Sequence, residues 1–279
     1  MTSILFALLS AVSWGSGDFF GGLASRKTGP FLAVLFGELT GSVFLFGTFI
    51  FYKEAIPTWN ILLIAALAGA LGSVGLIILY YAMAQGQMSI ATPVSALMAA
   101  AIPVAVGSFL EGVPAATKIG GFFLAFLAVW LVAQERSNQT QLNRLADLRW
   151  PLFSGVCFGV YFILIHQASQ TGIIWPMAAA RVSGVLIIFL FLLFKKEKFQ
   201  VKNNKTWYLI VLNGILDVGG NAFYILAGQT GRLDIAATIS SLYPGMTVLL
   251  AWLVLKEQMN NIQKLGILSA LVAIFFLTI

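Results

Sequence analysis

Four ionisable side chains stand inside long apolar stretches of this sequence, namely Asp18, Glu38, Arg181 and Asp217. Carboxylates can bind hydroxyl groups or cations and can exchange protons, and a guanidinium group can pair with carboxylates. A charged group at the centre of a membrane helix costs about 2.5–3.5 kcal/mol on insertion scales, so such groups usually face the protein interior or a wet cavity. We therefore predict that these four residues contribute to one polar site that binds substrate or couples its movement.

A stripe of polar residues surrounds Asp217. Asn213, Asp217, Asn221 and Tyr224 follow one another at spacings of four, four and three, which puts them on one face of a helix. Hydrogen bonding between helices is the alternative explanation for such a stripe. Four polar groups in register exceed what simple packing requires, so we predict that the stripe faces a substrate path.

A second polar face lies near the N-terminus, where Ser10, Trp14 and Asp18 are four residues apart beside Gly15 and Gly17. The face is consistent with a cavity wall that offers an aromatic surface and a carboxylate. It is equally consistent with glycines that permit close helix packing and an Asp18 that pairs locally. Both interpretations stay open at this point.

The composition indicates that lipid surrounds the elements that carry these residues. Of the 279 residues, 59% are hydrophobic and 9% are charged, against about 25% charged in soluble domains. Apolar runs near the spanning length of about 20 residues recur through the chain, and none alternates with a period of two, so we expect helices. The sequence predicts an all-α, multi-pass protein of the cell membrane with ten transmembrane helices, at about 3–23, 31–51, 59–84, 90–110, 118–134, 150–168, 175–194, 207–228, 235–255 and 263–279.

The chain contains an internal repeat with an offset of 143 to 146 residues. It predicts two related units, residues 1–134 and 150–279, and because each has five spans the second crosses the membrane in the opposite sense. Inverted repeats of this kind are common in secondary transporters. The matching segments pair Ser10–Gly15 with Ser154–Gly159, Glu38–Gly41 with Arg181–Gly184, and Ala82–Leu97 with Ala227–Leu242.

Glu38 and Arg181 hold equivalent positions in the two repeats. They could face each other across a central site, as a gate pair or as separate substrate contacts, or form a purely structural buried pair. Tyr243 is a candidate cavity aromatic, although core packing explains it equally well. Three prolines interrupt the fourth and ninth spans, namely Pro93, Pro103 and Pro244. They could free backbone carbonyls that line a cavity, or they could simply kink the helices.

At this point the sequence resembles EamA domains of the drug/metabolite transporter superfamily over nearly its whole length. The resemblance lies in Trp14-Gly15, in Arg181 early in the seventh span, and in the segment Tyr224–Glu257. The first half departs from the pattern, with Glu38 where an arginine is expected. The resemblance implies a carrier of small metabolites, often an exporter, and leaves the substrate open.

No motif indicates catalysis, a metal site, a cofactor or a nucleic-acid partner. We therefore expect a secondary transporter, not an enzyme, that moves a small metabolite, amino acid or drug-like solute. Because Arg181 can neutralise only one of three carboxylates, we hypothesise proton-coupled exchange with Glu38 or Asp217 as the proton carrier. The alternatives are a passive facilitator and an intramembrane protein that transports nothing.

The loop charges predict the orientation in the membrane. Connections after the odd-numbered spans hold twelve Lys and Arg residues, whereas the others hold only three, Lys53, Lys118 and Arg232. The positive-inside rule places the odd connections in the cytoplasm and both termini outside. Reporter fusions at Ile279 and within residues 135–149 should therefore give opposite readings, and a cytoplasmic C-terminus would contradict the assignment.

Overall fold

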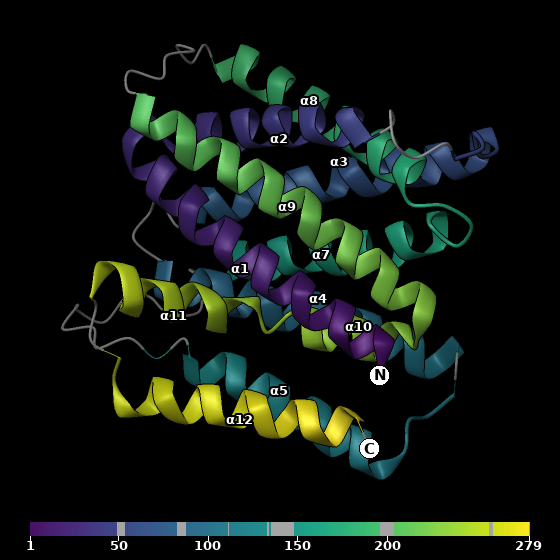
Figure 1. Ribbon diagram of the computed structural model, residues 1–279, viewed down its shortest axis with the longest axis vertical. Helices are drawn as coiled ribbons and strands as arrows, with labels where there is room; N and C mark the ends of the chain where they lie inside the picture. The colour runs from purple at the N-terminus through teal and green to yellow at the C-terminus, as the bar shows by residue number, and fades with distance from the viewer. Residues whose placement is uncertain are drawn as a thin grey trace.

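The computed structural model describes residues 1–48, 54–82, 88–110, 112–132, 134, 148–195, 204–256 and 259–278, and Figure 1 shows their arrangement. Most of the predicted cytoplasmic loop 135–149 lies outside this range, as does Ile279. Every element in the described part is a helix. The helices are α1 Thr2–Thr28, α2 Pro30–Thr48, α3 Trp59–Ala82, α4 Met88–Leu110, α5 Ala116–Val132, α7 Arg149–Ala168, α8 Ile174–Lys195, α9 Asn204–Thr230, α10 Leu233–Ser240, α11 Tyr243–Leu255 and α12 Asn261–Thr278.

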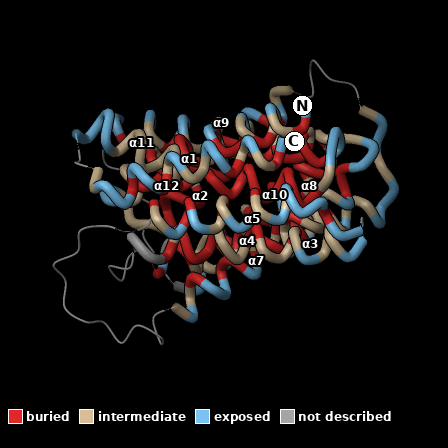
Figure 2. Tube along the Cα trace, turned by 90° about the horizontal axis from the view of Figure 1, so that it is seen from below, coloured by how far each residue is buried: buried red, intermediate tan, exposed pale blue. Residues whose placement is uncertain are grey.

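The helices confirm the predicted fold class. Within the described residues, nine segments are long and apolar enough to cross a membrane, with 233–255 counted as one, and the shorter α5 adds another apolar helix. Both chain ends lie at the same end of the helix bundle, in two views at right angles (Figures 1 and 2). A chain that crosses the membrane an even number of times has both of its ends on the same side.

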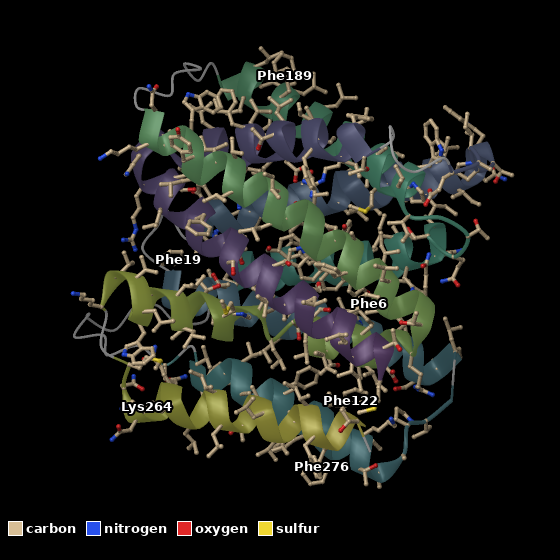
Figure 3. All side chains as sticks on the ribbon, in the orientation of Figure 1. Phe6, Phe19, Phe122, Phe189, Lys264 and Phe276 are labelled. Carbon is tan, nitrogen blue, oxygen red and sulfur yellow. The ribbon has the colours of Figure 1, made fainter. Side chains whose placement is uncertain are left out.

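The outer surface of the bundle is apolar. Buried residues follow the inner faces of the helices and exposed residues follow the outer faces (Figure 2). Phe194 on α8 is 86% exposed and Phe123 on α5 is 69% exposed. Phe189 and Phe276 project outward at opposite edges of the bundle (Figure 3). Such a surface suits hydrocarbon as its surroundings.

The ninth predicted span is broken, as its proline suggested. Between α10 and α11 the backbone leaves the regular helix at Ser241 and Leu242, and Pro244 lies in the first turn of α11. Pro244 has no N–H to donate, and proline is well tolerated at this helical position. In the fourth span, Pro93 and Pro103 both lie inside helix α4, which continues past each of them. A membrane helix can leave single carbonyls without their usual donor when its surroundings compensate.

The helices of the two halves interlock in a repeated pattern (Figure 1). Helix α1 packs along α9, and its equivalent α7 packs along α3. Helix α2 also packs on α9, as α8 does on α3, while α5 and α12 pack against each other. Each half therefore completes its core with helices of the other half.

Individual hydrogen bonds repeat in the same way. The Ser10 hydroxyl donates to the Gly220 carbonyl at 2.9 Å, and the equivalent Ser154 hydroxyl donates to the Gly75 carbonyl at 2.8 Å. The Ser183 hydroxyl donates to the carbonyl of Ala66 at 2.6 Å. Its counterpart Thr40 donates to the carbonyl of Ile210 at 3.4 Å. Positions that correspond in the predicted repeat thus make similar hydrogen bonds.

Small residues allow α2 and α9 to cross at backbone contact. A Cβ added at Gly214 would lie 2.5 Å from the Gly37 carbonyl oxygen and 2.7 Å from the Gly41 nitrogen. Gly37 and Gly41 form a small-residue pair four apart, a common device for close helix approach in membranes. The crossing fixes the depth of Glu38, which follows Gly37 directly.

The equivalent crossing of α3 and α8 positions Arg181. A Cβ added at Gly69 would overlap the backbone of Ala180, and one added at Gly184 would lie 2.5 Å from the Ser73 hydroxyl oxygen. Because Arg181 follows Ala180, the two crossings place Glu38 and Arg181 at matching positions.

Substituting Gly69→Ala should therefore destabilise the protein, because the new methyl group meets backbone atoms that cannot rotate away. Overpacking of this kind costs about 1–3 kcal/mol. The matched control is Gly120→Ala in α5, where nothing lies within 4 Å of the added Cβ. Thermal unfolding in detergent should show a lower melting temperature for Gly69→Ala and no decrease for Gly120→Ala. Equal melting temperatures for Gly69→Ala and the parent would show that the crossing is not close.

Candidate functional site

A cavity of about 110 Å³ lies between the two halves. Helices α1, α2, α3, α7, α8, α9 and α11 all contribute to its wall. The lining residues are Trp14, Asp18, Glu38, Gly69, Gly72, Ser73, Leu76, Leu79, Phe158, Tyr161, Phe162, Met177, Ala180, Arg181, Asp217, Asn221 and Tyr243. The wall therefore combines ionisable, amide, hydroxyl and aromatic groups inside an apolar bundle.

Arg181 on α8 bridges two carboxylates from opposite halves. Its Nη1 donates to Glu38 Oε2 on α2 at 2.5 Å, and its Nη2 donates to the Asp217 carboxylate on α9. The Arg181 side chain is only 7% exposed, whereas that of Asp217 is 29% exposed. Buried charges need partners and hydrogen bonds to offset the loss of water. The bridge satisfies this requirement and ties three helices together.

A chain of hydrogen bonds continues from Asp217 to α7. Asn221 donates from Nδ2 to the Asp217 carboxylate at 3.2 Å and to the Asp217 carbonyl at 2.7 Å. The Tyr161 hydroxyl donates to Asn221 Oδ1. The network fixes the orientation of the Asn221 amide and leaves the Asp217 carboxylate partly accessible.

Asp18 on α1 lines the same cavity but, among the described residues, forms no ion pair with Arg181 and no hydrogen bond. It lies close enough to Asp217 for the two carboxyl groups to interact electrostatically. Among the described residues, no hydrogen bond or ion pair to the Asp18 carboxyl group is found. Of the three carboxyl groups in the cavity, Asp18 is thus the one without a cation beside it.

Aromatic rings form another part of the cavity wall. Trp14 stacks on Phe162 with ring centroids 5.3 Å apart and planes at 19°, and Tyr243 meets Trp14 edge-on at 6.5 Å. Tyr161 lies against Phe162 at 5.6 Å. Aromatic faces placed beside convergent polar groups are typical of sites for small organic ligands.

Two members of the predicted stripe on α9 lie away from the cavity lining. The Asn213 amide donates to the Gly17 carbonyl at 2.9 Å and so attaches α9 to α1. Tyr224 is 1% exposed, packs behind Trp14 and Phe162, and donates its hydroxyl to the Phe162 carbonyl at 3.2 Å. The other predicted site residues line the cavity, namely Trp14, Asp18, Glu38, Arg181, Asp217, Asn221 and Tyr243.

Several lining residues were missed by the sequence analysis, and the internal repeat points to some of them. Phe158 stands 144 residues after Trp14, and Gly72 stands 145 residues before Asp217. Tyr161 had no such signal beyond a hydroxyl group in an apolar span. Among the described residues, no group of three His, Cys, Asp or Glu side chains is placed to hold a metal ion.

Comparison with known proteins identifies the family. The model of the EamA-like transporter family matches residues 1–134 and 148–279. The "Putative sugar uptake protein YxfA" of Lactococcus lactis is 26% identical over 268 residues, covering 87% of this chain and 84% of the relative. A protein of Streptococcus pyogenes serotype M1, also named a putative sugar uptake protein, is 26% identical over 260 residues, covering 87% and 85%.

Two further comparisons concern half of the chain and the fold. An uncharacterised protein of Methanocaldococcus jannaschii is 30% identical over 134 residues, covering 47% of this chain and 96% of its own. A solved crystal structure superposes with a TM-score of 0.81 at 13% identity, covering 98% of this chain and 95% of the other, which shows a shared fold. Because the family model matches nearly the whole chain, this protein belongs to the EamA-like transporter family and is a multi-pass membrane transporter of small solutes.

Proposed function

We propose that the protein is a secondary transporter for a small, uncharged, hydroxyl-rich solute such as a sugar, which binds in the central cavity. The observation that carries the proposal is the Arg181 bridge to Glu38 and Asp217 beside the rings of Trp14 and Phe162. The protein acts as a carrier and not as an enzyme.

The charge arrangement argues against an anionic solute. The guanidinium group of Arg181 is already held by two carboxylates, so it offers no free charge to an anionic ligand. Carboxylate and amide oxygens instead accept hydrogen bonds from hydroxyl groups. The names of the relatives in Lactococcus lactis and Streptococcus pyogenes refer to sugar uptake, which supports the same class of solute.

The aromatic wall suits a ring-shaped solute. A sugar ring presents C–H groups on its faces and hydroxyl groups around its edge. The Trp14 ring can contact such a face while Asp217 and Asn221, which line the same cavity, contact the edge. The wall thus supplies contact area and the polar groups supply orientation.

We further propose that two five-helix repeats, residues 1–134 and 150–279, rock against each other around this site. Inverted repeats provide two arrangements of the same contacts, which open the site to alternate sides of the membrane. The family resemblance favours export, whereas the two relatives are named for uptake. A carrier of this type works in both directions, and the gradients across the membrane set the net direction.

Liposomes containing the purified protein test the solute class. We expect saturable exchange of a radiolabelled sugar from a panel of D-glucose, D-galactose, L-rhamnose and D-ribose, and none of L-lysine or L-glutamate. Exchange of the charged amino acids without exchange of any sugar would contradict the proposal.

Trp14→Ala should raise the half-saturation concentration for the transported sugar about tenfold, which corresponds to about 1.4 kcal/mol of binding. Trp59→Ala is the matched control, because Trp59 is 70% exposed at the start of α3 and away from the cavity. Concentration series in the same liposomes should show the increase in the first variant only. An unchanged half-saturation concentration in Trp14→Ala would remove this ring from the binding site.

Asp217→Asn should lower sugar exchange at least tenfold while the yield of folded protein stays near normal. The amide keeps the size of the side chain, and Glu38 still neutralises Arg181. Arg181→Gln should instead reduce the folded yield, since two carboxylates would lose their cation. Exchange assays and size-exclusion profiles from one preparation separate the two effects. Normal exchange by folded Asp217→Asn would exclude Asp217 from the transport path.

A further inference from the structure

We infer that Asp18 is the residue that binds and releases a proton in each transport cycle, so that proton and solute occupy the same cavity. The inference rests on the proposed transport function and names its coupling group. It replaces our expectation from the sequence, which favoured Glu38 or Asp217.

The ion pairs separate Asp18 from the other two carboxyl groups. Glu38 and Asp217 both accept hydrogen bonds from the guanidinium group of Arg181, which holds the two carboxyl groups in place. Asp18 has no ion pair or hydrogen bond among the described residues and faces the like charge of Asp217. A like charge nearby favours the protonated form of a carboxyl group. Among the described residues, Asp18 is thus the cavity carboxyl group with a like charge beside it and no cation to hold it.

The helices that pack against α1 bring no cation to Asp18 among the described residues. Helix α1 packs against α2, α9, α10 and α11. The cavity groups nearest these contacts are Glu38 on α2, Asp217 and Asn221 on α9 and Tyr243 on α11. On α10, Asp234 is paired with Arg232 and is not part of the cavity. Arg181 and Tyr161 lie in the wall with their own partners.

The charge balance explains how a proton would be coupled to the solute. With all groups ionised, three carboxylates against one guanidinium leave the cavity with a net charge of −2. Protonation of Asp18 reduces this charge to −1, which lowers the cost of enclosing the site between the halves. Asp18 takes the proton from water on one side and returns it to water on the other, with no other bond made or broken.

The position of Asp18 places proton and solute together. Asp18 follows Trp14 by four residues on the same helix, so both side chains lie on one face of α1. A sugar stacked on Trp14 is then within reach of the Asp18 carboxyl group. The protonated carboxyl can donate a hydrogen bond to a hydroxyl oxygen, which a carboxylate cannot do.

Imposed pH gradients in liposomes test the coupling with the sugar panel above. The parent protein should accumulate sugar about tenfold per unit of pH difference if one proton moves per solute, and a protonophore should abolish the accumulation. Asp18→Asn should fill liposomes only to the outside concentration under the same gradient, however fast or slowly it exchanges labelled for unlabelled sugar. Asp18→Glu should recover part of the accumulation.

Infrared spectroscopy provides a readout that needs no substrate. The band of protonated carboxyl groups in the parent protein should disappear in Asp18→Asn and remain in Glu38→Gln, and Asp18→Ser repeats the test should the amide variant not fold. A band that persists in folded Asp18→Asn overturns the assignment. So does uphill accumulation by Asp18→Asn, or accumulation driven by a sodium gradient at equal pH. Loss of the band in a protein that exchanges no sugar would refute the proposed solute and keep Asp18 as the proton site.

Discussion

A positive charge buried in a membrane protein must find its counter-charge within the protein, and the structure is organised around that requirement at Arg181. The guanidinium group reaches Glu38 on α2 and Asp217 on α9, one from each half of the chain. Removing one partner of a buried pair is far more damaging than replacing the pair as a whole, because it leaves a charge without compensation. The bridge therefore constrains α2, α8 and α9 together, and these helices define most of the polar side of the cavity.

The bridge in turn depends on how closely the helices approach each other. Gly37 and Gly41 meet Gly214 at backbone contact, and Gly69 meets Ala180 in the equivalent place. In lipid the apolar side chains gain little by leaving their surroundings, so packing and hydrogen bonds must hold the helices together. Ser10 and Ser154 each donate a hydrogen bond to a backbone carbonyl of a neighbouring helix and so help to hold the helices together. Small residues at the crossings let the helices approach closely, and the polar residues beside them form hydrogen bonds between the helices.

Much of this arrangement can be predicted from the sequence, because lipid restricts a chain to few options. The length of the apolar runs predicts the helices, and the repeat predicts which helices correspond. The rarity of charge inside the runs leads directly to Asp18, Glu38, Arg181 and Asp217. The rest depends on helix rotation, which a stripe of polar residues does not determine: Asn213 and Tyr224 share a face with Asp217 yet bond to neighbouring helices. Phe158 and Tyr161 were missed because aromatic residues in an apolar helix face lipid, core or cavity with similar sequence patterns.

The site is not symmetric in charge with respect to the two predicted repeats. Arg181 stands where the other half has Glu38, and Asp217 stands where it has Gly72. If the halves exchange their arrangement when the site opens to the other side, the contacts between α8 and α9 must change. Arg181 can then give up one carboxylate while it keeps the other, since its two partners lie on different helices. A single carboxylate partner would leave the guanidinium uncompensated during the change, at a cost of several kcal/mol per unpaired buried ion. Two carboxylates for one cation thus allow movement without an unpaired positive charge, and the surplus negative charge that results is what a proton in the cavity would offset.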